Sequence, residues 1–82
     1  MTKVRVYVTY KASILDPEAQ AIKGATSKMG YSEIKELRMG KYFDFEVEAD
    51  ESTAKEKVAA IANELLANPN METYTVEILG DN

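Results

Sequence analysis

The chain of 82 residues is long enough for one small domain, and it contains neither cysteine nor histidine. These absences exclude disulfides, zinc sites of the usual ligand types, cysteine nucleophiles and imidazole bases. Ten basic and fourteen acidic residues give a net charge of −4, which argues against nucleic-acid binding. The 45% apolar composition is that of a globular protein.

The cellular setting is predicted from what the sequence lacks. No apolar run approaches the roughly 20 residues of a membrane span, and the N-terminal residues lead into a strand without a signal-peptide core. We therefore expect a single cytoplasmic domain over residues 1–82. A chain this short buries only about 60 to 65% of its unfolded surface, so help from a partner is expected.

The first half of the chain begins with a strand and a helix. Residues 3–10 alternate as a half-buried strand does, with one face formed by Val4, Val6, Val8 and Tyr10. Asp16 and Pro17 mark a helix start, as the N-cap and the first helical residue. This helix is expected to end at Gly30, which can adopt the left-handed conformation.

The central stretch, Ile34–Glu48, is predicted to form the hairpin around which the other elements are organised. A two-residue turn would mix apolar and charged side chains on both faces. A three-residue loop, Gly40 to Tyr42, instead places Met39 opposite Phe43 and gives each strand one apolar face. We therefore expect two paired strands on either side of this loop.

A second helix and a last strand complete the predicted fold. Apolar residues recur at helical spacing from Ala54 to Leu65, with Asp50, Ser52 and Thr53 as alternative N-caps. The helix is expected to end at Asn68-Pro69, because asparagine tolerates the left-handed conformation and proline cannot continue a helix. The alternating strand that follows has an inward face formed by Tyr74, Val76 and Ile78.

The predicted order is strand, helix, strand, strand, helix, strand, which is the ferredoxin-like βαββαβ arrangement. We expect an α+β two-layer sandwich with a four-stranded antiparallel sheet and both helices on one face. Unpaired strand edges and an open sheet face are expected to favour oligomerisation through the sheet, as a homodimer or homotetramer.

No catalytic, metal-binding or cofactor-binding set emerges from the residues themselves. Asp44, Glu46 and Glu48 share one strand face and could hold a hard cation, but a solvated strand face explains them better. Arg38 could bind an anion or pair with Asp44 across the hairpin. Lys41 could present its ammonium group to an anion, but the Gly40-Lys41 sequence lacks the glycine spacing of a phosphate-binding loop. A structural turn is therefore favoured there.

Three sequence segments together resemble one family over essentially the whole chain. They are the opening KVRVYVTYKASILDPEAQAI, the turn Leu37–Tyr42, and Leu65–Pro69 followed by Glu72 and Tyr74. The chain thereby resembles PurS, the small subunit of phosphoribosylformylglycinamidine (FGAM) synthase. It departs from the usual pattern at Ala19, where the family has glycine.

The resemblance implies an accessory role in de novo purine biosynthesis. The complex converts formylglycinamide ribonucleotide to formylglycinamidine ribonucleotide, and the small subunit bridges the synthetase PurL and the glutaminase PurQ and assists ammonia transfer. ATP, magnesium and glutamine are then used by those partners and not by this chain. The resemblance makes interface candidates of Arg38, Gly40, Lys41, Tyr42, Asn68 and Pro69.

Other functions have less support from the sequence. An amino-acid-binding regulatory module shares the element order, but the Ser13-Ile14-Leu15 loop lacks the glycines that would favour it. GKYFDFEV is similar to the aromatic strand motif of RNA recognition domains, yet Phe43 and Phe45 are expected to be core residues. A self-sufficient enzyme is disfavoured because no nucleophile has a base beside it.

Overall fold

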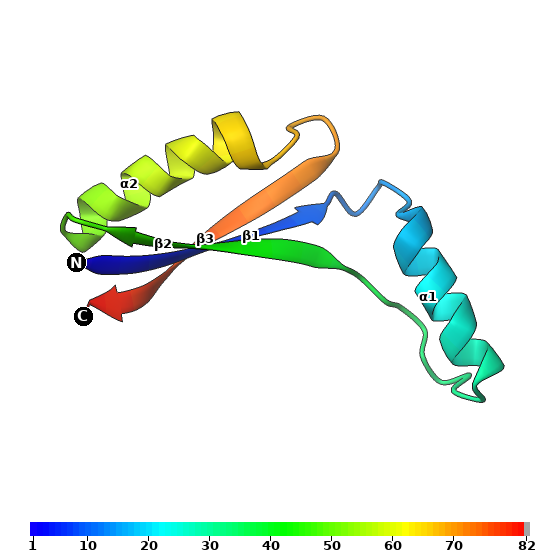
Figure 1. The fold of residues 1–82 in the computed structure, drawn as a ribbon. Coiled ribbons are helices and arrows are strands. Elements are labelled where there is room, and N and C mark those ends of the chain that lie inside the picture. The colour runs from blue at the N-terminus through cyan, green and yellow to red at the C-terminus, as the bar shows by residue number, and fades with distance from the viewer. Residues whose placement is uncertain (82) are drawn as a thin grey trace.

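The computed structural model describes residues 1–81. The chain forms, in order, β1 (Thr2–Tyr10), α1 (Pro17–Lys28), β2 (Gly40–Val47), α2 (Glu51–Ile61), the π-helical segment η1 (Ala62–Leu66) and β3 (Glu72–Asp81) (Figure 1). The three strands make one antiparallel sheet in the order β2-β1-β3. The first strand is therefore the central one and pairs with a neighbour on each side.

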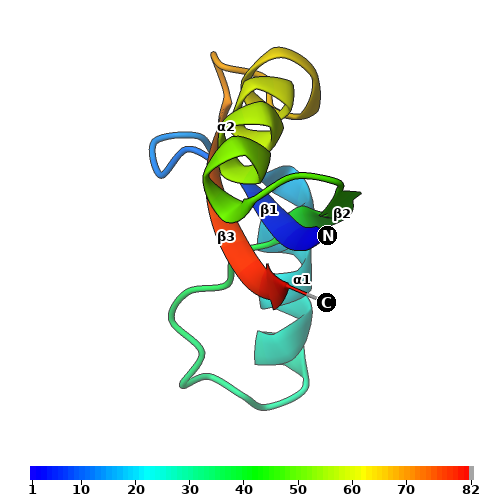
Figure 2. The same cartoon turned by 90° about the vertical axis from the view of Figure 1, so that its left-hand side faces the viewer.

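The hydrophobic core lies between the sheet and α2. Val4, Val6 and Val8 on β1 are at most 1% exposed and meet the buried side of α2, formed by Ala54 and Val58. The predicted inward residues of the flanking strands pack against this core: Phe43, Phe45, Val47, Tyr74, Val76 and Ile78. The predicted facing of all three strands is thus confirmed. Figure 2 shows α2 lying along one side of the sheet.

Aspartates begin both α-helices. Asp16 Oδ1 accepts hydrogen bonds from the backbone N–H groups of Glu18 (3.0 Å) and Ala19 (3.3 Å), with Pro17 at the first helical position. Asp50 Oδ1 accepts from the Thr53 N–H at 2.8 Å, so it is the cap among the three alternatives. After α1, Gly30 has a φ of +96°, which confirms its predicted left-handed conformation.

The Asp50 cap predicts a pH-dependent contribution to stability. The hydrogen bond from the Thr53 backbone lowers the pKa of Asp50 below its ordinary value of 3.8. A lowered folded-state pKa contributes stability that is complete above this ordinary value and is lost as pH falls through the folded-state pKa. Asp50→Asn keeps a capping oxygen but no charge. The urea midpoint of the wild type should exceed that of Asp50→Asn at pH 7, and the difference should shrink below pH 3.8. A difference that does not change with pH would contradict this origin.

The predicted central hairpin and the four-stranded sheet are wrong. Residues 34–39 lie outside the sheet, and β2 pairs along its whole length with β1, so that Gly40 stands opposite Thr9. The alternating pattern identified the inward faces correctly, but a period of two does not specify which strand is the neighbour. The chain runs straight through Gly40 into β2, and the sheet therefore has three strands.

The placement of both helices on one sheet face is also wrong. Helix α2 covers the sheet, whereas α1 lies beyond the end of the sheet and is joined to it by residues 11–16 and 29–39 (Figure 1). The radius of gyration is 16.1 Å, and the molecule measures 48 × 28 × 13 Å. A compact chain of this length would have a radius of gyration of about 12 Å. We call residues 11–39, which leave the sheet and return to it, the arm.

Candidate functional site

The six interface candidates occupy separate parts of the structure. Gly40, Lys41 and Tyr42 begin β2, where they are strand residues and do not form the predicted loop. Asn68 and Pro69 lie in the turn between η1 and β3. Arg38 lies in the arm, just before β2. The set is therefore divided among a sheet edge, a turn and the arm.

Glu72 connects two of these groups at the end of the sheet. Its Oε1 accepts a hydrogen bond from the Asn68 backbone N–H at 2.7 Å, and its Oε2 lies 3.9 Å from the Lys41 ammonium nitrogen. The Glu72 side chain is only 17% exposed. Lys41, Asn68 and Pro69 therefore belong to one corner, which we call the Glu72 corner. Glu72 belongs to one of the three sequence segments that resemble the family. The spacing of residues in that segment does not indicate that Glu72 would contact both Lys41 and Asn68.

The turn in the Glu72 corner is closed by its own hydrogen bonds. Asn68 Oδ1 accepts from the Asn70 N–H at 3.0 Å, and the Asn68 carbonyl accepts from Met71 (3.0 Å) and Glu72 (2.7 Å). No non-glycine residue in the described part of the chain has a positive φ, so the predicted left-handed Asn68 is wrong. The helical region ends instead at Leu66, where the backbone becomes extended at Ala67.

A cavity of about 260 Å³ opens beside the Glu72 corner. Its lining residues are Val8, Tyr10, Asp16, Glu18, Met39, Gly40, Lys41 and Glu72. The lining contains three carboxylates and one lysine, so its charge is negative overall. A negatively charged lining does not suit a phosphate or carboxylate ligand.

Tyr42 lies on the open face of the sheet, opposite to the face that α2 covers. The Arg5 guanidinium carbon is 4.4 Å from the centre of the Tyr42 ring, and the Tyr7 ring centre is 6.2 Å away. Arg5 donates to Asp44 through Nε (2.7 Å) and Nη2 (2.9 Å). Exposed tyrosine and arginine are enriched at protein interfaces, so this cluster suits a docking surface.

The predicted pairing of Arg38 with Asp44 is replaced by the Arg5–Asp44 pair. Hydrogen bonding to the Arg5 guanidinium holds the pKa of Asp44 below its usual range, and the same bond raises the pKa of Arg5. Arg38 Nε lies 3.9 Å from Glu36 Oε1. The strand face that carries Asp44, Glu46 and Glu48 was predicted to be solvated. It also contains the ion pair between Arg5 and Asp44.

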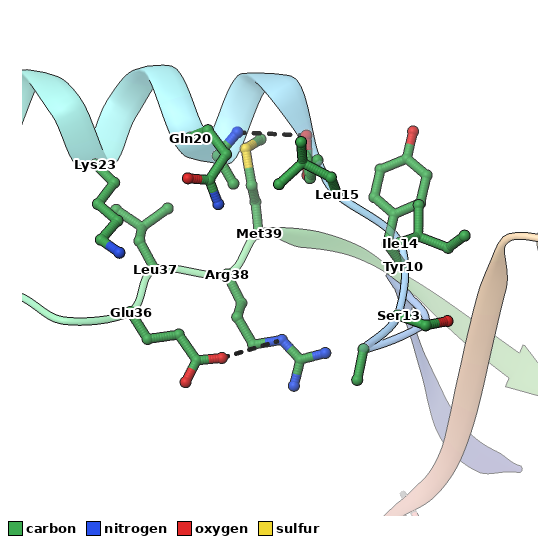
Figure 3. Close-up of a pocket in the computed structure, with 13 residues that line it drawn as sticks. Tyr10, Ser13, Ile14, Leu15, Gln20, Lys23, Glu36, Leu37, Arg38 and Met39 are labelled. Atoms are coloured by element: carbon green, nitrogen blue, oxygen red, sulfur yellow. Dashed lines mark hydrogen bonds and ion pairs between the residues drawn. The ribbon is translucent and has the colours of Figure 1, made fainter.

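Arg38 borders a second cavity, of about 270 Å³, inside the arm. In Figure 3, Leu37 and Met39 point toward α1, whereas Glu36 and Arg38 point away from it. Residues 36–39 thus alternate as an extended segment, with their apolar side chains against the helix. The structure does not bring Arg38 together with the other five candidates.

The described residues contain no group of acidic side chains arranged to hold a metal ion. None of the helices within residues 1–81 is long and apolar enough to cross a membrane. What the structure does present is a three-stranded sheet with exposed polar and aromatic surfaces and a projecting helix. These features define a small α+β protein suited to binding other proteins.

Comparison with known sequences identifies the family to which the chain belongs. Residues 3–80 match the family described as "PurS: Phosphoribosylformylglycinamidine (FGAM) synthase", and the chain belongs to this family. It is 37% identical over 78 residues to the FGAM synthase subunit PurS of Bacillus subtilis, covering 95% of this chain and 93% of the relative. It is 40% identical over 76 residues to that of Mycobacterium leprae, covering 93% and 94%.

Solved structures agree with this assignment. The crystal structure of Methanocaldococcus jannaschii PurS, described as one of the subunits of formylglycinamide ribonucleotide amidotransferase, covers 100% of both chains with a TM-score of 0.90 and 30% identity. A chain from the structure of PurLQS from Thermotoga maritima matches with a TM-score of 0.87 and 34% identity, covering 95% of this chain and 96% of that one.

Proposed function

We propose that this chain is the accessory PurS subunit of an FGAM synthase complex, in which it bridges PurL and PurQ and assists ammonia transfer. The observation that carries the proposal is the nearly full-length match to PurS subunits, including a chain from a PurLQS structure. The complex acts in the cytoplasm in this proposal, and ATP, magnesium and glutamine are used by the partner subunits. The chain itself acts as a homo-oligomer.

The surfaces of the structure fit a binding role. The Glu72 corner offers a half-buried carboxylate and an exposed lysine at one end of the sheet, and Tyr42 with Arg5 offers an aromatic and cationic surface on the open face. These two surfaces lie on opposite sides of β2, because neighbouring strand residues face opposite ways. A subunit with two separate surfaces can contact two partners simultaneously.

The regulatory small-molecule-binding alternative is not favoured. The curated relatives that cover nearly the whole chain are PurS subunits. The cavity at the Glu72 corner is rich in carboxylates, which would repel the carboxylate of an amino acid.

The proposal predicts a selective effect on glutamine-driven synthesis. PurL and PurQ should convert formylglycinamide ribonucleotide with glutamine only when this chain is added, because ammonia must pass between two bridged subunits. Ammonia-driven conversion should depend on it far less, because free ammonia needs no second active site. An equal response of both reactions, or of neither, would contradict the bridging role.

A charge reversal tests whether the Glu72 corner takes part. Lys41→Glu should weaken glutamine-driven activity, since it places a second carboxylate beside Glu72 and removes its ion-pair partner. Lys55→Glu on the exposed part of α2 is the matched control, because it makes the same charge change away from the corner. Equal activity of the two variants would remove Lys41 from the interface.

A further inference from the structure

Strand β2 lies at the edge of the sheet, and no strand within residues 1–81 pairs with its outer side. Alternate residues of such an edge direct their backbone N–H and C=O groups outward, where they can pair with a strand of another chain. The eight residues of β2 keep one continuous register with β1, and their sequence GKYFDFEV contains no proline. This edge can therefore accept an added strand along most of its length.

The opposite edge of the sheet is less suited to pairing. The register of β3 with β1 shifts between Lys3 and Val4, and Gly80 at the same end has a φ of +138°. A bulge bends an edge strand and interrupts regular pairing, and natural proteins use bulges to protect free edges. Strand β2 has no such irregularity, so it is the edge that can pair regularly.

The side chains of β2 specify which strand can be added. Phe43 and Phe45 lie on the α2 side of the sheet and are partly exposed, whereas Asp44 and Glu46 are exposed on the open face. Opposite charges pair favourably across neighbouring strands, and like charges directly opposite each other are destabilising. Pairing with β2 of a second copy, centred on residues 44–46, would place carboxylates opposite carboxylates. The two faces therefore match a foreign strand that alternates apolar and basic residues.

A cavity of about 470 Å³ adjoins the acidic side chains of β2. Its lining residues are Lys3, Asp44, Phe45, Glu46 and Leu79. Lysine and arginine lay their aliphatic stems along apolar surface and keep their charged heads among polar groups. Phe45 and Leu79 suit such a stem. Asp44 already accepts two hydrogen bonds from Arg5, so Glu46 is the more available carboxylate for the cation.

We propose that the free edge of β2 binds an extended segment of a partner subunit, with apolar residues beside Phe43 and Phe45 and a basic residue over Glu46. This deepens the proposed function and rests on it, because the partners are the other subunits of the synthase. Backbone hydrogen bonds along β2 supply affinity, and the alternating side chains supply specificity.

Hydrogen exchange in the assembled complex tests the strand pairing directly. In the presence of PurL and PurQ, deuterium uptake by the outward amides of β2 should slow at least about tenfold, because they become hydrogen-bonded. Uptake by β3 is the internal control and should change little. Unchanged uptake in β2, or equal slowing in both strands, would overturn the inference. So would slow uptake in the free chain that depends on its concentration, because a second copy would then cover the edge.

A charge reversal tests the proposed basic contact. Glu46→Lys should weaken binding of the chain to PurL and PurQ about tenfold, because it places two like charges together. Glu77→Lys makes the same change on the exposed face of β3 and should bind as the wild type does. Both variants should keep the circular dichroism spectrum of the wild type, and equal binding by the two would overturn the basic contact. If the wild type forms no assembly, the proposed function fails as well, whereas these results within an intact assembly refute only the inference.

Discussion

Replacement of Gly40 by alanine is expected to lower the free energy of unfolding by about 1–3 kcal/mol, the usual cost of overpacking. A Cβ at this position would lie 2.6 Å from Thr9 Cγ2 and 2.7 Å from the Val8 carbonyl oxygen. The threonine methyl group can rotate away, but the Val8 oxygen belongs to the sheet backbone. Denaturant unfolding measured at one pH gives the loss directly from the shift in midpoint.

Two further variants separate the causes of that loss. Gly24→Ala adds the same methyl group where nothing lies within 4 Å, and it should stabilise helix α1. Gly40→Ala combined with Thr9→Ser removes the threonine methyl group and should restore only part of the stability, because the Val8 oxygen remains. If Gly40→Ala is as stable as the wild type, the close approach of β1 and β2 is wrong.

Replacement of Val6 by aspartate is expected to unfold the chain at neutral pH. Val6 is fully buried at the centre of the sheet, where Phe43 and Val76 stand opposite it on the two neighbouring strands. The effective penalty for burying an unpaired ion is several kcal/mol, and small domains are stable by only about 5 kcal/mol. Circular dichroism should show loss of the cooperative unfolding transition.

A control on the same sheet establishes that burial is the cause. Thr75→Asp introduces the same carboxylate on the exposed face of β3, in register with Tyr7 of β1. Surface substitutions usually change stability by no more than about 0.5 kcal/mol, so this variant should keep a cooperative transition. A Val6→Asp variant that unfolds at the same urea concentration as Thr75→Asp would contradict the proposed core.

The sequence predicted which side of each strand faces the core, because that information is local. Val4, Val6 and Val8 alternate with polar residues, and their burial follows from a period of two. The caps were equally predictable, since Asp16 acts on the N–H groups of residues two and three positions ahead.

The neighbours of these strands were not predictable in the same way. A hairpin at Gly40 and a straight run into β2 give the same alternation, and the choice depends on β1, which is distant in sequence. The same limit applies to the candidate site. Glu72 joins Lys41 and Asn68 through contacts that form only when β3 and β2 flank one central strand.

The position of α1 shows a further limit of reasoning from one chain. The capped start of this helix is encoded locally, but its packing surface is not found in its own sheet. A prediction that places every helix on the sheet of the same chain will fail for such an arm.

The bridging role is tested most directly by asking whether this chain joins PurL to PurQ. We would mix the two partner subunits with glutamine and magnesium nucleotide, with and without the chain, and measure the mass of the assemblies by light scattering during size-exclusion chromatography. We expect one assembly that contains all three proteins when the chain is present, and separate PurL and PurQ when it is absent. Equal association of PurL and PurQ without the chain would contradict the bridging role.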